Sequence, residues 1–170
     1  MKLPKTFLKH SDILNVIIET PRGCGNKYSY DSDTGLFKLS KVLPQGLVFP
    51  LHFGFLPGTK GDDGDPLNVI ILMDEMTFPG NVVECKELGI IEAKQTDKNG
   101  KTMRNDRILA TAVESKRYSE LKSVKQVDKY LLDEITKFFI TYNAMRGKKF
   151  TPIAYRGPSR AINLVKKQLT

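Results

Sequence analysis

Apolar and polar residues follow two different patterns along the chain. Up to Val113, the apolar residues come in short runs, some continuous and some alternating with polar residues, and Gly, Pro, Asn and Asp separate the runs. Runs of this length and composition are typical of β-strands joined by turns. A Pro- and Gly-broken aromatic segment interrupts them at 49–55. We expect strands at 15–21, 27–30, 36–42, 69–72, 82–91 and 107–113.

The last third of the chain contains the predicted helices. From Val127 to Tyr142 the apolar residues recur at helical spacing and form one stripe, and Gly147 follows the end of this pattern. A second, shorter helix is expected at 159–169. Short strands followed by helices indicate the α+β class, and we predict a small closed barrel flanked by two C-terminal helices. No linker interrupts the pattern, so residues 1–170 are expected to form a single domain.

Composition and charge narrow the functional classes. The chain has 170 residues, of which 40% are apolar, enough for a sizeable core. Residues 1–100 hold 11 Lys/Arg and 13 Asp/Glu, a net charge of −2, whereas residues 101–170 hold 16 and 6, a net charge of +10. This asymmetry suits a site for a polyanion bound together with cations, and it also suits a nucleic-acid binder.

The two cysteines and the N-terminus bear on the compartment. Cys24 and Cys85 have no metal-type spacing, and two free thiols in a reducing cytosol are favoured over a disulfide. The first ten residues lack an apolar leader, and no window reaches the length of a membrane span. We therefore expect a cytoplasmic protein that does not associate with membranes.

The strongest chemical signal is an acidic turn. Asp62, Asp63 and Asp65 fall within four positions, Pro66 follows them, and a buried strand is predicted directly afterwards. Close carboxylates repel one another, so a site that keeps them together usually binds a cation. An all-oxygen cluster suits Mg²⁺ or Mn²⁺. The alternative, for the motif alone, is a solvated acidic turn.

The segment Asp63-Gly-Asp65-Pro-Leu-Asn68-Val resembles the signature of the family I soluble inorganic pyrophosphatases, Asp-x-Asp-Pro-hydrophobic-Asp-hydrophobic. Further similarities extend from about Ile17 to Tyr155, most of the chain. The resemblance implies a five-stranded OB-like barrel with C-terminal helices. It also implies Mg²⁺-dependent hydrolysis of pyrophosphate to two phosphates by metal-activated water, in an oligomer that is hexameric in many bacterial relatives and dimeric in fungal ones.

The resemblance assigns roles to individual residues. Asp65 falls on the general base, Lys27 on a lysine that contacts phosphate, and Tyr142 on a phosphate-binding tyrosine. Lys41 and Arg107 fall on further cationic positions, with Lys148 as an additional candidate. The metal-binding positions are occupied by oxygen-bearing side chains: Glu19, Asp63, Asn68, Asp97, Asn105 and, by a one-residue shift in the alignment, Asp106.

Several site positions depart from the family pattern. Asn68 and Asn105 replace aspartates, so two negative charges are lost and we expect weaker Mg²⁺ binding and a less acidic bridging water. Lys41 replaces an arginine and loses its bidentate fork, whereas Arg107 replaces a lysine. The remaining departures are Ser29 for Glu, Phe49 and Phe53 for Tyr, and Asn143 for Lys.

Several candidate residues can also be interpreted as having no functional role. Glu19 is also consistent with a surface charge at a strand end, Lys27 and Lys41 with solvated lysines, Asp97 with an ordinary turn and Tyr142 with a core residue.

Three functions follow from this pattern. The leading one is an inorganic pyrophosphatase, with reduced activity as one form of it. The second is a hydrolase of another phosphoanhydride, because Phe49 and Phe53 alter the pocket wall. The third is a binder of phosphate or pyrophosphate without turnover. Nucleic acid is the least favoured ligand, because no run of aromatics is interleaved with Lys and Arg.

Overall fold

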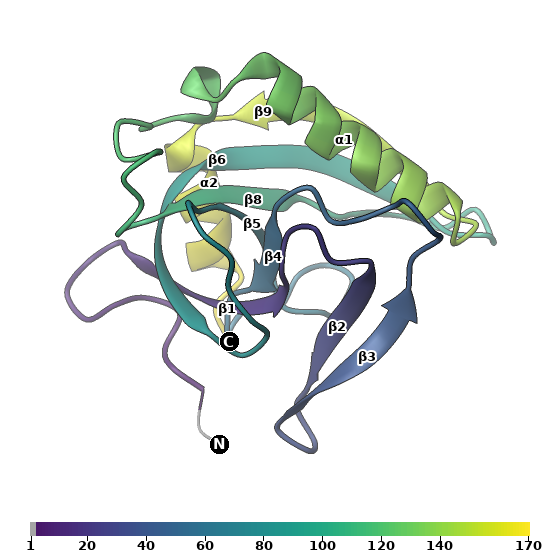
Figure 1. Cartoon of the computed structure of the whole chain (residues 1–170), viewed down its shortest axis with the longest axis horizontal. Helices are drawn as coiled ribbons and strands as arrows, with labels where there is room; N and C mark the ends of the chain where they lie inside the picture. Colours follow the sequence, from purple (N-terminus) through teal and green to yellow (C-terminus); the bar gives the residue numbers. More distant parts are fainter. Residues whose placement is uncertain (1–2) are drawn as a thin grey trace.

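The computed structural model describes residues 3–170, and most of the strands precede the two α-helices (Figure 1). The elements, in chain order, are β1 (Leu14–Thr20), β2 (Asn26–Asp31), β3 (Leu36–Val42), β4 (His52–Phe55), β5 (Asn68–Leu72), β6 (Val82–Thr96), β7 (Thr102–Arg104), β8 (Arg107–Ala112), the 3₁₀ turn η1 (Val124–Gln126), α1 (Lys129–Ala144), β9 (Lys149–Arg156) and α2 (Pro158–Lys167).

Five of the strands close into a ring. The pairing order is β1-β4-β5-β8-β6, and β6 pairs again with β1, where Leu14 lies opposite Cys85 and Val16 opposite Val83. β5 and β8 run parallel, and the other pairs of the ring are antiparallel. A closed ring leaves no open sheet edge within it. The predicted α+β fold with a five-stranded OB-like barrel and C-terminal helices is confirmed.

The two helices cover opposite faces of the barrel wall. Side chains alternate along a strand, and in β5 Ile70 and Leu72 pack in the apolar cluster that contains α1. Val69 and Ile71 pack in the other cluster, which contains Ala161 and Val165 of α2. Figure 1 shows α1 lying across the upper side of the barrel near β9. Within residues 3–170, no helix is long and apolar enough to span a membrane.

Three strands were not predicted: β4, which lies within the Pro- and Gly-broken aromatic segment at 49–55, β7 and β9. β9 contains a proline and is mostly exposed, so its sequence lacks a clear alternating pattern. It pairs with the far half of β6, where the register shifts between Glu92 and Ala93, and Pro152 lies opposite Ala93 at this irregularity. β7 is only three residues long and pairs with the same half of β6. β6 therefore runs to Thr96, beyond the predicted 82–91.

The helix boundaries differ slightly from the prediction. Asp128 caps α1, and its carboxylate accepts hydrogen bonds from the backbone N–H groups of Tyr130 and Leu131. α2 begins at Pro158, which suits the first helical turn because it has no N–H to satisfy, and it ends at Lys167 rather than Leu169. After α1, Gly147 adopts a positive φ of 66°, which allows the chain to turn back into β9.

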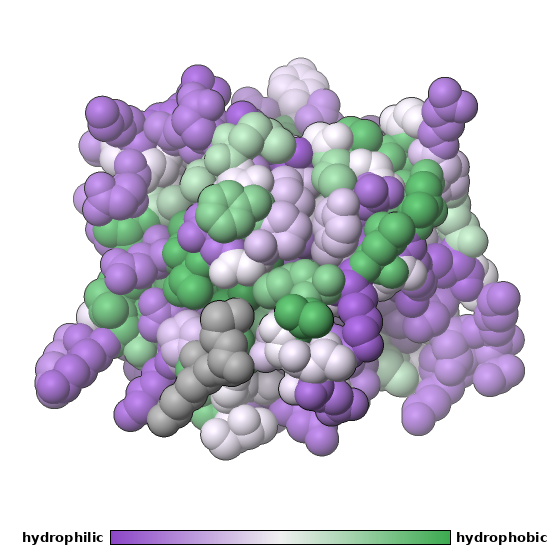
Figure 2. All heavy atoms as spheres, turned by 60° about the horizontal axis from the view of Figure 1, so that its bottom comes forward, coloured by the Kyte–Doolittle hydropathy of each residue, from purple (hydrophilic) through white to green (hydrophobic). Residues whose placement is uncertain are grey.

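Exposed apolar side chains occur on and beside the β2–β3 hairpin. They include Leu36, Leu39 and Val42 of β3 and Met76 and Phe78 of the loop before β6. Figure 2, which brings the lower side of Figure 1 forward, shows hydrophobic groups interspersed with hydrophilic ones on that face. Isolated apolar residues of this kind are normal on a protein surface, so they do not by themselves define an interface.

Replacing Gly54 by Ala should destabilise the barrel. A Cβ at this position of β4 would lie 2.2 Å from the backbone oxygen of Ile17 in β1, so the two strands would have to separate. Overpacking of this kind costs about 3 kcal/mol of unfolding free energy. Urea denaturation measures the loss. Gly25→Ala is the control, because its added Cβ would lie 3.7 Å from the nearest backbone oxygen, and a Gly54→Ala variant as stable as Gly25→Ala would contradict the expectation.

Candidate active site

Most of the candidate residues line one cleft of about 390 Å³. The barrel strands form its floor, the acidic turn before β5 and the β6–β7 turn form two sides, and the end of α1 forms another. The additional candidate Lys148 lies in its wall, as do nine of the eleven predicted site residues: Glu19, Lys27, Asp63, Asp65, Asn68, Asp97, Asn105, Arg107 and Tyr142.

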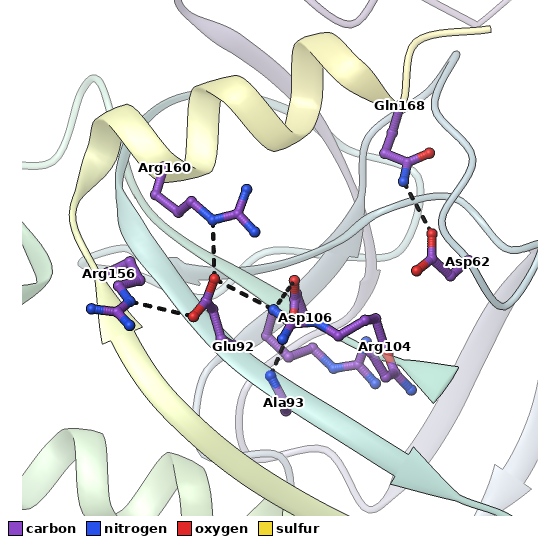
Figure 3. Close-up of polar contacts among 10 residues, drawn as sticks. Asp62, Glu92, Ala93, Arg104, Asp106, Arg156, Arg160 and Gln168 are labelled. Carbon is purple, nitrogen blue, oxygen red and sulfur yellow. Dashed lines mark hydrogen bonds and ion pairs between the residues drawn. The ribbon is translucent and has the colours of Figure 1, made fainter. Parts of the chain in front are cut away.

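Backbone hydrogen bonds and the C-terminal segment fix the acidic turn. Gly64 has a φ of 88°, the N–H of Gly61 donates to the backbone oxygen of Asp65 at 2.7 Å, and the N–H of Asp65 donates to Oδ1 of Asp63 at 3.2 Å. From the other side, Nε2 of Gln168 donates to Oδ1 of Asp62 at 3.2 Å (Figure 3). Asp62 therefore points away, and Asp63 and Asp65 are the two aspartates of the turn that line the cleft.

Two carboxylates of the cleft, Asp63 and Glu19, are held in an environment that disfavours their negative charge. Although Asp63 stands at the exposed rim, loss of surrounding water raises its pKa, and the negative charge of Asp65 adds to the rise. Glu19 is buried and accepts a hydrogen bond from the N–H of Tyr30 at 2.9 Å. Burial raises the pKa of Glu19, and Lys27 opposes this effect. A bound cation would relieve both carboxylates.

Lys27 projects from β2 into the same cleft. Its Nζ donates to Oγ of Ser29 at 3.3 Å and lies 5.6 Å from the ring centre of Phe53. Burial lowers the pKa of Lys27, whereas Glu19 raises it. The serine that replaces the family's glutamate thus leaves this lysine with a neutral hydrogen-bond partner.

Arg107 is the most buried cation of the site. It is only 7% exposed, and its Nη1 donates to Oδ1 of Asn68 at 2.6 Å and to Oδ1 of Asn105. Nδ2 of Asn105 in turn donates to Oε1 of Gln95 at 2.9 Å. Burial lowers the pKa of Arg107 to about 10, and Asp63 is the largest opposing influence. The guanidinium remains charged at neutral pH.

Tyr142 and Asp97 complete the wall of the cleft. The hydroxyl oxygen of Tyr142 is buried without a hydrogen-bond partner among residues 3–170, so its hydrogen-bonding capacity is unused. Burial raises the pKa of Tyr142. Oδ1 of Asp97 accepts the N–H groups of Asn99 and Lys101 at 2.8 and 2.9 Å, so this residue shapes its turn as well as facing the cleft.

Two predicted residues lie elsewhere. Oδ1 of Asp106 accepts the N–H of Ala93 at 2.9 Å, and its carboxylate pairs with Arg104 beneath α2, close to the contacts of Glu92 with Arg156 and Arg160 (Figure 3). The one-residue shift that would have made Asp106 a metal-binding residue of the cleft is therefore not supported, because its carboxylate pairs with Arg104 and does not line the cleft. Asp106 instead lines a neighbouring hollow of about 140 Å³ beside Arg160, which shares Asp63, Asn68, Asn105 and Arg107 with the cleft.

Lys41 also lies outside the cleft. It pairs with Lys27 across the β2–β3 hairpin and lines a neighbouring depression with Tyr142 and Arg146. Asn143 points into the protein, where its Nδ2 donates to the backbone oxygen of Phe139 at 2.8 Å. Neither side chain lines the cleft that contains Asp65.

Several residues of the cleft were not predicted from the sequence. Arg146 stands one helical turn after Tyr142, and its guanidinium lies 5.4 Å from the centre of the tyrosine ring. This four-residue spacing was a usable signal for Arg146. Gln95, Lys101 and Met103 enter the wall through β6, the turn that follows it and β7, and no pattern in the sequence pointed to them.

The oxygen-bearing side chains of the cleft meet some of the requirements for binding a divalent cation. Among residues 3–170, no group of three or more His, Cys, Asp or Glu side chains converges as a complete metal site. Mg²⁺, however, is commonly held by one or two carboxylates together with waters and phosphate oxygens. Asp63 and Asp65 supply such a pair at the rim of the cleft, whereas the amides of Asn68 and Asn105 are already engaged by Arg107.

Comparisons with known proteins agree with this geometry. The family model described as inorganic pyrophosphatase matches residues 16–170. An inorganic pyrophosphatase of Halalkalibacterium halodurans is 34% identical over 153 residues, 90% of this chain and 91% of that protein, and one of Nostoc sp. is 38% identical over 141 residues, 83% and 80%. The crystal structure of inorganic pyrophosphatase from Thermus thermophilus superposes with a TM-score of 0.86 at 32% identity, covering 97% of this chain and 93% of that one. The chain therefore belongs to the family I soluble inorganic pyrophosphatases, hydrolases of the phosphoanhydride bond.

Proposed function

We propose that this protein hydrolyses inorganic pyrophosphate to two phosphates in a Mg²⁺-dependent reaction, with Asp65 as the general base. The observation that carries the proposal is the meeting of Asp63 and Asp65 with Lys27 and Arg107 in one cleft of a chain that belongs to the pyrophosphatase family. In this proposal the carboxylates hold the divalent cation and accept the proton of the attacking water. Lys27, Arg107 and the unpartnered hydroxyl of Tyr142 bind the phosphate oxygens.

The reaction needs a proton acceptor and charge stabilisation. Water attacks one phosphorus atom, Asp65 accepts a proton from that water, and the P–O–P bond breaks as the second phosphate leaves. Lys27 and Arg107 stabilise the negative charge that shifts to the leaving phosphate. Mg²⁺, when bound beside Asp63, would lower the pKa of the attacking water and neutralise phosphate oxygens. Phe53 contacts both cations and limits the water around them.

A phosphate-release assay tests this function. Purified protein with pyrophosphate and Mg²⁺ should release two phosphates per pyrophosphate, and Mn²⁺ should be the first alternative ion to try. Release that does not depend on a divalent ion would contradict the proposed mechanism. Binding of pyrophosphate without any release would instead favour the third function, a protein that has kept the site and lost turnover.

A second candidate substrate class is favoured by the aromatic wall. Phe49, Phe53 and Phe139 line the cleft, and Phe49 and Phe53 bring no hydroxyl groups to it. A less polar wall suits a phosphoanhydride with a larger substituent, such as a nucleotide, or a polyphosphate. A substrate panel at equal Mg²⁺ decides between them. A turnover of pyrophosphate far above that of every alternative would exclude this class.

The proposal extends to the organisation of the protein. We expect a single domain that unfolds in one transition and a homo-oligomer, dimeric or hexameric, whose mass light scattering would measure. The free thiols of Cys24 and Cys85 are consistent with a cytoplasmic location.

A further inference from the structure

Arg107 is a buried cation whose direct partners are neutral. Its Nη1 donates to the amide oxygens of Asn68 and Asn105, and its Cζ lies 5.9 and 5.3 Å from the ring centres of Phe53 and Phe139. Its Nε is buried without a partner, and no carboxylate among residues 3–170 lies within ion-pair distance of it. The positive charge is therefore held in place but not neutralised.

An uncompensated buried charge is costly, and proteins usually bury one only beside a partner. Arg104, half-buried and only three residues earlier in the chain, shows the usual arrangement, because it pairs with Asp106 and Glu92. Arg107 differs because its surroundings open into the cleft. An anion in the cleft would supply the missing negative charge.

The same cleft holds more positive charge than negative. Its described wall contains five cationic side chains, Lys27, Lys101, Arg107, Arg146 and Lys148, and four acidic ones, Glu19, Asp63, Asp65 and Asp97. Lys27 lies against the same Phe53 ring as Arg107, and both Phe53 and Arg107 are buried. The low dielectric around buried groups strengthens the attraction of these cations for a polyanion.

We infer that this cleft binds inorganic pyrophosphate without a divalent cation, with the guanidinium of Arg107 as the fixed positive charge between Asn68 and Asn105. The inference rests on the proposed function for the identity of the ligand. The two amides orient the guanidinium and leave its charge intact, whereas a pair of carboxylates would neutralise it. The chain itself therefore supplies a positive charge that a second bound cation would otherwise bring.

The test is direct binding of pyrophosphate to protein freed of divalent ions by a chelating resin. Calorimetry at about 0.15 M salt limits the contribution of distant surface charges. Wild-type protein should bind pyrophosphate, and Arg107→Met should weaken binding by about tenfold or more, because a charge-assisted hydrogen-bonding group is lost. Arg107→Lys, which keeps the charge, should recover part of the affinity.

Two further variants make the test specific. Arg104→Met removes an arginine from the same segment that is paired with Asp106, and its pyrophosphate affinity should equal that of wild type. Asn68→Asp should weaken metal-free binding, because the new carboxylate would neutralise Arg107. Thermal unfolding is the control for folding of Arg107→Met. We expect this variant to fold, because an apolar group of similar length replaces a buried charge.

Three results would overturn the inference: no binding until Mg²⁺ is added, equal losses in Arg107→Met and Arg104→Met, or tighter metal-free binding by Asn68→Asp. Each can occur while phosphate release with Mg²⁺ is normal, so this inference fails separately from the proposed function. Conversely, metal-free binding without any turnover would support the inference and count against hydrolysis.

Discussion

Replacing Asp65 by Asn is expected to lower the rate of pyrophosphate hydrolysis by about 10²- to 10⁴-fold, the contribution of a general base. Asn has nearly the same shape, but its amide cannot accept a proton from the attacking water. The backbone contacts of Asp65 with Gly61 and Asp63 do not use its carboxylate, so the turn should keep its conformation in the variant. Phosphate release under saturating Mg²⁺ measures the effect.

The matched control for Asp65→Asn is Asp62→Asn. This substitution removes the same charge from the same turn, but the Asp62 side chain bonds to Gln168 outside the cleft (Figure 3). It should retain most of the activity. Similar losses in both variants would mean that the turn acts through its total charge, and Asp65 would then not be the base.

The acidic turn was predictable because its conformation is local. Gly64 and Pro66 determine the backbone there, and the apolar run after them determines which way β5 enters the barrel. Its anchoring was not predictable. The N–H of Lys60 donates to the backbone oxygen of Gln168, and Thr59 pairs with Leu169, so the last residues of the chain hold the turn in place. Contacts between residues this far apart leave no periodic signal in a sequence.

The same distinction explains why Asp106 does not line the cleft. The resemblance located the segment, but the contact of the Asp106 carboxylate with Arg104 decides which of the neighbouring side chains faces the cleft. β8 begins at Arg107, and Asn105 and Arg107 face the cleft together, whereas Asp106 between them faces α2. In the β2–β3 hairpin, Lys27 and Lys41 lie opposite one another on paired strands, yet only Lys27 reaches the cleft.

Restoring a carboxylate by Asn68→Asp is expected to lower the Mg²⁺ concentration for half-maximal rate by about tenfold, equivalent to about 1.4 kcal/mol of added affinity. Asn68 lies in the wall of the cleft that contains Asp63 and Asp65, and its oxygen contacts Arg107. The structure therefore does not support a role in which this side chain only caps the turn. A carboxylate has a second oxygen, which remains free to bind Mg²⁺ while the first accepts from Arg107.

The control for this variant adds the same charge outside the cleft. Asn99→Asp lies in the exposed β6–β7 turn and should leave the Mg²⁺ titration of the rate unchanged. If Asn68→Asp and wild type gave superimposable titrations, the side chain at 68 would not reach a bound ion. A shift that appeared in both variants would show only a general attraction of added negative charge for Mg²⁺. The expected result, tighter Mg²⁺ binding together with weaker metal-free pyrophosphate binding, occurs only if the carboxylate and Arg107 share one position beside the substrate.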